Sequence, residues 1–316
     1  MAGLLVSIFC QTYNHEPYIR QCIEGFLMQK TDFSFEVLVH DDASTDQTAD
    51  IVREYEVKYP DIIKPIYQTE NQFSKGISIS ITFQYPRAKG KYIAFCEGDD
   101  YWIDPLKLQN QVDLLEKYED VGLVYSKARC FQQSTNKFRR ERIGDQYCIF
   151  RNLILFNSIP SLTTCYRKDI YSNYLKDIHP EKLSWVMGDY PTWLYFALHS
   201  KVKFINEIQG VYRILENSAS HSKNVYKQLS FNESTYKIRM FYLSKENGKE
   251  IDRLKKKVIE EFLYAKFLLL LKSKMPLDEI YEDIRNSGII SFKMTFAYLI
   301  KYFYFLRFFL IIIPSK

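Results

Sequence analysis

The chain has 316 residues, of which 47% are hydrophobic and 26% are charged, the proportions of an ordinary globular protein. This composition excludes an intrinsically disordered chain and a protein with many membrane spans, and the length suffices for one large α/β domain with a smaller addition. The net charge of +5 could suit an anionic lipid or a nucleotide and by itself decides nothing. We expect no nucleic-acid partner.

The cysteines and the N-terminus indicate the compartment. None of the six cysteines forms a CxxC pair, and four lie in apolar runs such as Ile8–Cys10 and Ala94–Cys96, so we expect buried, reduced thiols. The first six residues lack the basic and long apolar regions of a signal peptide. We therefore expect a cytoplasmic protein.

Strand and helix patterns alternate over the first 125 residues. The apolar run Val6–Cys10 predicts a strand, and apolar residues at helical spacing over 19–27 predict the helix that follows it. The alternation continues with strands expected at Phe35–Val39, Ile62–Tyr67, Tyr92–Cys96 and Gly122–Tyr125, and with helices around residues 51–55, 77–88 and 106–115. This order predicts an α/β fold with a mainly parallel central sheet and helices on both faces.

The remainder of the chain is less regular. Residues 132–144 are charged and resemble a loop, mixed elements follow as far as Arg213, and a helical, apolar pattern begins after Asn217. We expect one α/β domain over residues 1–220 and a helical C-terminal region over residues 221–316.

Polar residues stand where three of the predicted parallel strands end. Asn14 follows the first strand, Asp42 follows the second, and Glu97-Gly98-Asp99-Asp100 follows Tyr92–Cys96. Ligands in such sheets bind at the carboxyl ends of the strands, so these residues are candidates for a binding site.

The four-residue acidic segment is the strongest chemical signal. Three carboxylates so close together repel one another and raise each other's pKa unless a cation lies among them, and hard oxygen ligands suit Mg²⁺ or Mn²⁺. The alternative is a solvated acidic turn without function. That alternative does not explain the second acidic pair, Asp41-Asp42, at the end of an earlier strand of the same sheet.

Asp189 is a lone carboxylate among the apolar and aromatic residues of Trp185–Trp193. Desolvation there would raise its pKa toward a value suited to proton abstraction. The alternative role is the N-cap of a following helix, and the two roles are compatible.

The chain resembles the family 2 glycosyltransferases, which have the nucleotide-diphospho-sugar transferase fold called GT-A. The resemblance covers roughly residues 4–220 and is carried by separate motifs in the family's order. These motifs are Val6-Ser7-Ile8 through Tyr13-Asn14-His15-Glu16, then Val39-His40-Asp41-Asp42-Ala43-Ser44-Thr45-Asp46, Ala88–Phe95, Glu97-Gly98-Asp99-Asp100, Gly188-Asp189 and Val211-Tyr212-Arg213.

The resemblance implies a donor site at the strand ends. Asp42 corresponds to the aspartate that hydrogen-bonds the nucleotide base, and the Thr12–Glu16 loop corresponds to a wall of the same pocket. The donor-binding residues implied in this way are Thr12, Asn14, Glu16, Asp42, Glu97, Asp100 and Arg213.

The resemblance also implies a metal site and a base. Asp99 corresponds to the metal-binding aspartate of the DxD motif, and Glu97 replaces the first Asp, whose usual partner is the ribose. The implied cofactor is Mn²⁺ or Mg²⁺, which would offset the charge of the diphosphate. Asp189 corresponds to the catalytic base, with Gly188 in place of the family's Glu, and His221 is left out of the metal site.

The implied reaction is an inverting sugar transfer from a UDP-sugar to an acceptor hydroxyl, such as that of a lipid-linked glycan in surface polysaccharide synthesis. Residues 1–125 would hold the donor and residues 126–220 the acceptor. Two alternatives remain open, a nucleotidyltransferase and a non-catalytic sugar-binding protein on the same fold. No GxGxxG or GxxxxGK[ST] motif occurs, which disfavours a dinucleotide-binding oxidoreductase or a P-loop kinase.

The segment Ile289–Ile313 is rich in aromatic residues and has no acidic residue. Its charges, Lys293, Lys301 and Arg307, fall on one helix face about 120° wide, which is typical of an interfacial amphipathic helix. We therefore expect a peripheral attachment to the anionic inner face of the cell membrane. The alternative is a helix that packs on the catalytic domain or in a dimer.

Overall fold

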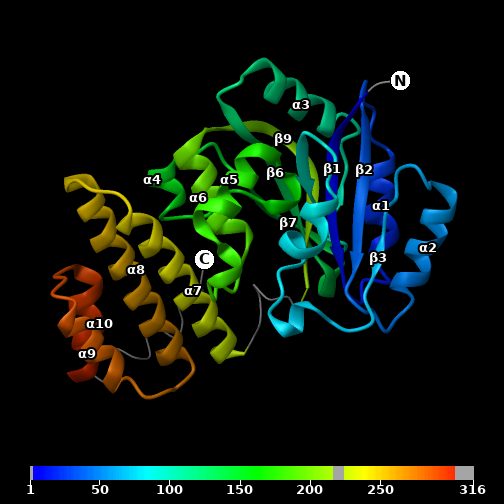
Figure 1. Ribbon diagram of the computed structural model, residues 1–316. Coiled ribbons are helices and arrows are strands. Elements are labelled where there is room, and N and C mark those ends of the chain that lie inside the picture. Colours follow the sequence, from blue (N-terminus) through cyan, green and yellow to red (C-terminus); the bar gives the residue numbers. More distant parts are fainter. Residues whose placement is uncertain (1–2, 216–223, 303–316) are drawn as a thin grey trace. The chain divides into compact units, whose positions relative to one another are not determined.

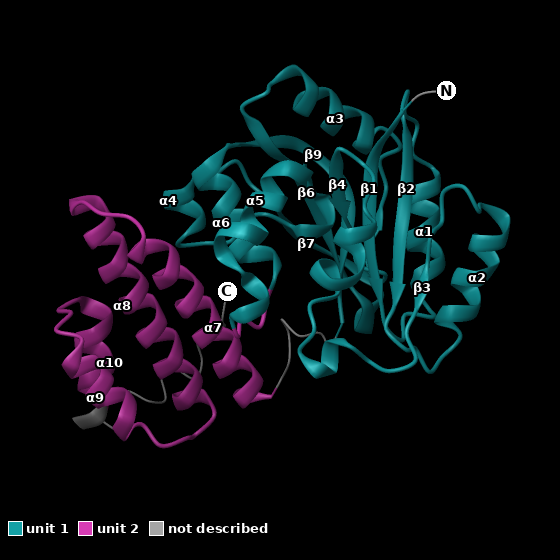
Figure 2. Cartoon of the chain, viewed as in Figure 1, with its two compact units in different colours: residues 1–183, 188–215 teal, residues 184–187, 216–316 magenta. Residues whose placement is uncertain are grey.

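The structure is a computed structural model that describes residues 3–215 and 224–302. The chain forms two compact units, of which unit 1 comprises residues 1–183 and 188–215 and unit 2 comprises residues 184–187 and 216–316 (Figure 2). The boundary that we expected at residue 220 lies outside the described residues.

The first half of unit 1 has the alternating order predicted from the sequence. Strands β1 (Leu4–Thr12), β2 (Ser34–Asp41), β3 (Ile66–Tyr67) and β4 (Tyr92–Phe95) pair in parallel in the order β3-β2-β1-β4 (Figure 1). Helix α1 (Ile19–Leu27) joins β1 to β2, and α2 (Thr48–Lys58) joins β2 to β3. Because these strands are parallel, the loops that follow them lie at one edge of the sheet.

The second half makes the sheet mixed. The elements of this half are β5 (Tyr101–Trp102), α3 (Lys107–Lys117), β6 (Val121–Gln132), β7 (Lys137–Ile143), α4 (Phe150–Leu153), β8 (Cys165–Arg167), α5 (Lys168–Ile178), α6 (Asp189–His199) and β9 (Lys201–Ile214). The order continues from β4 as β8-β6-β9-β5, with β7 beside β6. Strands β6 and β9 are parallel, whereas β5, β7 and β8 pair antiparallel with their neighbours. The sheet is therefore mixed. Its longest ladders, β1–β2 and β6–β9, are parallel as expected, and the antiparallel ladders of β5, β7 and β8 are short.

Helices cover both faces of the sheet, as predicted. On one face, alternate residues of β1 such as Val6 and Ile8 pack in a buried cluster with residues of α1, α2 and α3. On the other face, the Tyr166 ring of β8 contacts Tyr171 of α5 and Phe196 of α6, with ring centroids 5.5 and 5.3 Å apart. The six cysteines are free and buried, which confirms their assignment as reduced core thiols.

Three sequence predictions differ from the structure. Strand β3 is shorter than Ile62–Tyr67 because Pro65 has no amide to donate, and Ile63 makes only an isolated bridge to Val37. Residues 77–88 contain a π-helical turn at Ser80–Gln84 and a 3₁₀ turn at Tyr85–Arg87 in place of a regular helix. The segment 132–144 was wrongly expected to be a loop, because β7 is an exposed, charged strand that lacks the usual apolar alternation.

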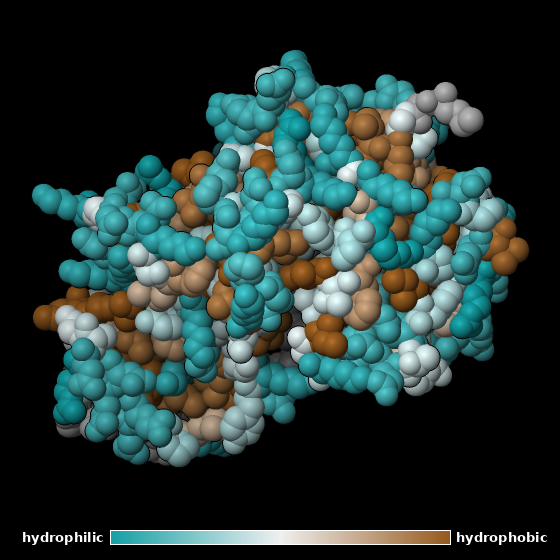
Figure 3. Space-filling view, in the orientation of Figure 1, coloured by the Kyte–Doolittle hydropathy of each residue, from teal (hydrophilic) through white to brown (hydrophobic). Residues whose placement is uncertain are grey.

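The described part of unit 2 contains four helices, α7 (Val225–Ser244), α8 (Lys249–Lys272), α9 (Asp278–Asn286) and α10 (Phe292–Tyr302). Its core includes Phe267 of α8, Ile280 of α9 and Ala297 of α10. Residues 184–187 belong to this unit, since Trp185 packs its ring against Phe241 at 5.3 Å. In Figure 3, hydrophobic residues also reach the surface over these helices.

Among the described residues, no helix has both the length and the apolar character that a membrane span requires. Helix α10 covers part of the segment Ile289–Ile313, and its residues Met294, Ala297 and Ile300 are buried in the core of unit 2. One face of this part therefore packs against the other helices of unit 2, and not on the catalytic domain. Residues 303–313 of the segment lie outside the described residues.

Gly90 is required where the chain approaches β1. Its amide donates to Ser7 Oγ at 2.9 Å, and a Cβ at this position would lie 2.5 Å from the Ser7 amide nitrogen. We expect Gly90→Ala to lower the free energy of unfolding by about 1–3 kcal/mol, because backbone atoms must shift to admit the methyl group. The matched control is Gly3→Ala, where no atom lies within 4 Å of the new Cβ. Urea unfolding of both variants measures the difference, and equal stability would contradict the close approach.

Candidate functional site

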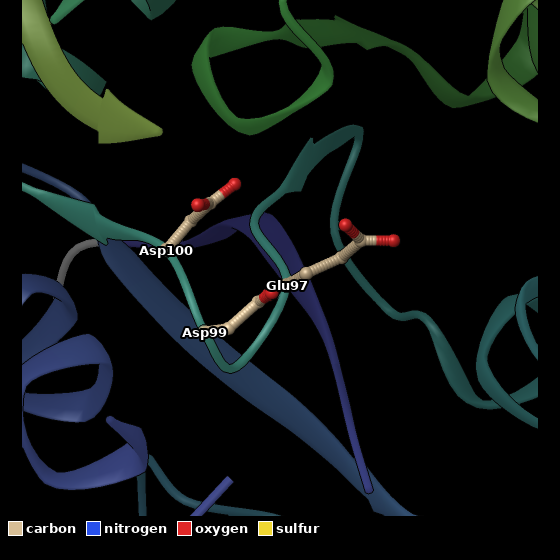
Figure 4. A group of neighbouring side chains, drawn as sticks. All are labelled: Glu97, Asp99 and Asp100. Atoms are coloured by element: carbon tan, nitrogen blue, oxygen red, sulfur yellow. The ribbon is translucent and has the colours of Figure 1, made fainter. Parts of the chain in front are cut away.

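The turn between β4 and β5 carries the three predicted carboxylates, Glu97, Asp99 and Asp100 (Figure 4). One oxygen from each side chain lies within 4.8 Å of the others. The turn is fixed to the end of β1, because the Gly98 amide donates to the Gln11 carbonyl at 2.8 Å. The sheet therefore holds the carboxylates together at the edge where its parallel strands end.

Crowding and burial perturb two of these carboxyl groups. The pKa of Glu97 is raised to about 8, first by desolvation and then by repulsion from Asp99 and Asp189. Glu97 nevertheless keeps part of its surface exposed to solvent, which screens some of this repulsion. Asp100 is buried, and burial together with Asp99 raises its pKa well above the ordinary range. This crowding is a cost that a bound cation would relieve.

The donor set fits a hard divalent cation. Carboxylate oxygens are the ligands that Mg²⁺ and Mn²⁺ prefer, and Glu97 and Asp99 present theirs from the surface of the turn. Asp100 is more constrained, since its Oδ1 accepts the Arg213 amide at 2.7 Å. Glu97 and Asp99 are thus the residues best placed to hold the ion.

Arg213, near the end of β9, braces the acidic turn. Its guanidinium donates to the carbonyl of Asp99 and to the side chain of Gln21, and lies over the rings of Tyr18 and Tyr101 at 5.0 and 4.6 Å. Its Nε is buried and has no hydrogen-bond partner within the parts of the chain that the structure describes. The positive charge is therefore fixed beside the carboxylates.

Gly98 packs against Thr12 and His15. A Cβ on Gly98 would lie 2.8 Å from Thr12 Oγ1 and 3.0 Å from His15 Nδ1. Both atoms are buried without a hydrogen-bond partner among the described residues, and burial lowers the pKa of His15 although Asp99 opposes this. His15 is not among the residues predicted from the sequence, where its position between Asn14 and Glu16 is the one signal for it.

Asn14 and Glu16 join the loop after β1 to the loop after β2. Asn14 adopts a left-handed backbone conformation with φ of 55°, and its Oδ1 accepts the Thr45 amide at 2.8 Å. Glu16 Oε2 accepts the Gln47 amide at 3.2 Å, and the Glu16 amide donates in turn to Asp46. These side chains build the loops as well as forming part of their surface.

Asp42 is buried at the end of β2 and already has two backbone donors. Its Oδ1 accepts the Gln72 amide at 2.8 Å, and its Oδ2 accepts the Phe73 amide at 3.0 Å. A carboxylate has about four lone-pair sites, so Asp42 can still accept another hydrogen bond. In the structure it orders the segment around Gln72 and Phe73.

Asp189 is the first residue of α6, and the N-cap is Gly188. Asp189 is therefore not the N-cap residue itself, although its negative charge lies in the first turn of the helix. Desolvation raises the pKa of Asp189, and the amides of Tyr190 and Asp189 offset part of that effect. Its negative charge contributes to the raised pKa of Glu97, which places Asp189 near the acidic turn.

The structure thus brings together the predicted residues Glu97, Asp99, Asp100, Asp189 and Arg213. Thr12 joins this group through its contact with Gly98, whereas Asn14, Glu16 and Asp42 lie on the neighbouring loops. His221 lies outside the described residues.

Comparison with known proteins identifies relatives of this chain. A family model described as Glycosyl transferase family 2 matches residues 7–174, more than half of the chain. The protein Mb1547 of Mycobacterium bovis is 32% identical over 225 residues, which are 69% of this chain and 61% of Mb1547, so the chain spans less than two thirds of that relative. WfgD of Escherichia coli, named UDP-Glc:alpha-D-GlcNAc-diphosphoundecaprenol beta-1,3-glucosyltransferase, is 27% identical over 232 residues, 72% of this chain and 84% of WfgD.

Two solved structures have the same fold. S. aureus TarS 1-349 in complex with UDP matches with a TM-score of 0.61 and 21% identity, covering 89% of this chain and 78% of that one. Mannosyltransferase PcManGT from Pyrobaculum calidifontis, in complex with GDP-Man and Mn²⁺, matches with a TM-score of 0.58 and 15% identity, covering 97% and 84%. These matches confirm the GT-A fold expected from the sequence.

The carboxylate geometry predicts that the protein binds Mn²⁺ at the acidic turn. We expect Asp99→Asn to weaken Mn²⁺ binding by at least about 10–100-fold, the loss found when even outer-shell partners are removed. Binding should also weaken as the pH falls from 9 through about 8, because Glu97 then gains a proton that the cation must displace. Glu97→Gln should remove this part of the pH dependence.

Electron paramagnetic resonance of free Mn²⁺ measures this binding. The matched control is Asp61→Asn, which alters an exposed carboxylate outside the acidic turn. Unchanged affinity in Asp99→Asn would contradict the assignment of the turn as a cation site.

Proposed function

This chain belongs to glycosyltransferase family 2, and we propose that it transfers a sugar from a nucleoside-diphosphate sugar to an acceptor hydroxyl, with inversion at the anomeric carbon. One observation carries the proposal. A desolvated carboxylate suited to act as a base, Asp189, lies beside a turn whose carboxylates suit a divalent cation. Proton abstraction and departure of a diphosphate both need such groups within one site.

The donor would bind at the carboxyl edge of the parallel strands. Asp42 and the Thr12–Glu16 loop would enclose the nucleotide base, and Arg213 would meet the diphosphate. We favour UDP as the nucleotide, by analogy with the UDP complex of TarS. The donor half would comprise residues 1–125 and the acceptor half residues 126–220.

Glu97 and Asp99 would hold Mn²⁺ or Mg²⁺. Asp100 would stabilise the turn through its hydrogen bond with the Arg213 amide. When bound, the ion would offset the negative charge of the diphosphate and so stabilise the leaving group. Mn²⁺ is present in the complex of PcManGT, which supports this choice of metal.

In the reaction, Asp189 takes the proton of the acceptor hydroxyl. The acceptor oxygen forms a bond to the anomeric carbon as the bond between that carbon and the phosphate oxygen breaks. The electron pair of the broken bond leaves with the nucleoside diphosphate. A single displacement on the opposite face inverts the configuration.

The acceptor would be a lipid-linked glycan of a surface polysaccharide. The printed name of WfgD, with a diphosphoundecaprenol-linked sugar as acceptor, supports this choice. A cytoplasmic enzyme that meets such an acceptor works at the inner face of the membrane, so we propose a peripheral location.

A nucleotidyltransferase or a non-catalytic sugar-binding protein would behave differently. Either would leave a nucleoside-diphosphate sugar intact when metal and a glycan acceptor are present. Release of the nucleoside diphosphate, dependent on both metal and acceptor, therefore distinguishes the proposed transfer from both alternatives.

Asp189→Asn tests the proposed base. We expect turnover to fall by about 10²–10⁴-fold, because the amide cannot take the acceptor proton, while the variant still binds Mn²⁺ and nucleotide. Release of nucleoside diphosphate in the presence of acceptor measures turnover. The matched control is Asp169→Asn, which alters an exposed Asp in the first turn of α5. Near-normal turnover in Asp189→Asn would assign the base to another residue.

The C-terminal segment would provide the membrane contact. Phe292, the first residue of α10, and Ile290 just before it have 86% and 95% of their surface exposed, whereas Met294, Ala297 and Ile300 of α10 are buried in unit 2. Exposed apolar residues beside lysines such as Lys293 are typical of a helix at an anionic lipid surface. We propose that these exposed residues and residues 303–313 rest on the membrane together.

Co-sedimentation with anionic liposomes tests this proposal. We expect the full chain to pellet with the liposomes, and a chain that ends at Tyr302 to pellet less, because it loses the apolar residues of 303–313 but keeps the packed part of α10. Ile290→Ser combined with Phe292→Ser should weaken binding further. Neutral liposomes serve as the control, and equal recovery of all forms in the supernatant would refute the membrane role.

A further inference from the structure

Exposed apolar side chains gather in unit 1 between β7 and β8. Tyr147, Ile149 and Phe156 have 58%, 54% and 67% of their surface exposed. Beside them lies a hollow of about 250 Å³, lined by Asp145, Tyr147, Asn152, Leu155 and Phe156. Adjacent exposed apolar residues on a soluble protein commonly mark a binding surface.

The backbone of this hollow is well fixed. The Tyr125 hydroxyl donates to the Asp145 carbonyl, and Asp145 Oδ1 accepts the Tyr147 amide at 2.9 Å. On the other side, the Phe156 amide donates to the Asn152 carbonyl at 2.9 Å, at the end of the α4 turn. The exposure of the two rings is therefore not the result of a loose loop.

Two polar groups in the hollow remain open to a ligand. Asp145 Oδ2 and the side-chain amide of Asn152 make no hydrogen bond with any residue that the structure describes. A carboxylate oxygen accepts hydrogen bonds, whereas an amide both donates and accepts them. Two rings with such polar groups resemble the mainly apolar lining, with a few placed polar groups, that is usual in small-molecule sites.

This lining matches a neutral sugar ring. The C–H face of a pyranose is apolar and can lie on Tyr147 or Phe156, while its hydroxyls can donate to Asp145 and pair with Asn152. An anionic ligand would be repelled by Asp145. The volume is just below the range of about 300–1,000 Å³ for drug-sized ligands, which suits a ligand of one ring.

The hollow is tied to the helix that carries the proposed base. The Tyr190 hydroxyl donates to the Leu153 carbonyl of α4 at 2.8 Å, in a buried hydrogen bond. Tyr190 directly follows Asp189 in α6. A ligand held against α4 is therefore bound to the same rigid part of the fold as Asp189.

We propose that this hollow is an acceptor subsite, which holds one neutral sugar ring of the acceptor glycan between Tyr147 and Phe156. The role of this sugar as an acceptor rests on the glycosyl transfer proposed above. The binding of a sugar ring can be tested without any transfer.

Saturation-transfer NMR with the full chain tests the binding. The probes are the methyl glycosides of glucose, galactose and N-acetylglucosamine at millimolar concentration. We expect ring protons of at least one glycoside to receive saturation from the wild type, and this signal to be lost in Tyr147→Ala and in Phe156→Ala. Stabilisation by UDP with Mn²⁺ should be unchanged in both variants, which shows that they are folded. Tyr226→Ala, at an exposed aromatic residue of unit 2, is the matched control.

Kinetics add a second readout wherever the wild type transfers sugar. We expect Phe156→Ala to raise the acceptor KM by about 10-fold or more with little change in kcat, because binding outside the reacting centre is lost. If the wild type transfers no sugar but the glycoside signal depends on Tyr147 and Phe156, the proposed function fails and the sugar site stands. The subsite is overturned if the wild type gives no glycoside signal, if the variants keep it, or if they lose binding to anionic liposomes instead.

Discussion

The contact between the end of β9 and the turn after β4 is the constraint on which the site depends. Arg213 supplies its amide to Asp100 and its guanidinium to the carbonyl of Asp99, so one residue fixes both the buried carboxylate and the backbone of the turn. The contact joins residues more than 100 positions apart, and it exists only because the mixed half of the sheet returns β9 to β5. Correct folding of the second half of unit 1 is therefore a condition for the geometry of the acidic turn.

The sequence predicted the parallel half of the sheet and the acidic edge because each follows from local patterns. Apolar strands such as Val6–Cys10 end directly in polar residues, and parallel strands place those ends side by side. The antiparallel strands were harder to predict. Strand β7 is exposed and charged, so it lacks the alternation that marks a strand, and β5 has only two residues, Tyr101 and Trp102. The packing of His15 beneath Gly98 depends on two distant loops and has no local signal.

Three of the residues predicted to bind a donor also hold the loops of the site together. Asn14 and Glu16 use side-chain oxygens on the amides of Thr45 and Gln47, and Asp42 uses both of its oxygens on the segment that follows β3. These residues fix the loops before any ligand arrives, which reduces the entropy that binding must offset. Sequence patterns identify both kinds of residue but do not separate them, because a loop-building side chain and a ligand-facing one have the same residue type.

The electrostatics of the site explain why such rigid loops are needed. Four carboxylates lie in one region, those of Glu97, Asp99, Asp100 and Asp189. Their mutual repulsion favours any movement of the loops that separates these carboxylates. The guanidinium of Arg213 donates to the backbone carbonyl of Asp99 and not to a carboxylate. This hydrogen bond therefore holds the turn in place without neutralising its carboxylates. A site arranged in this way gains most when a cation arrives, since the same repulsion that opposes the empty arrangement becomes attraction for the ion. Rigidity at the strand ends thus keeps these like charges together in an arrangement that suits a divalent cation.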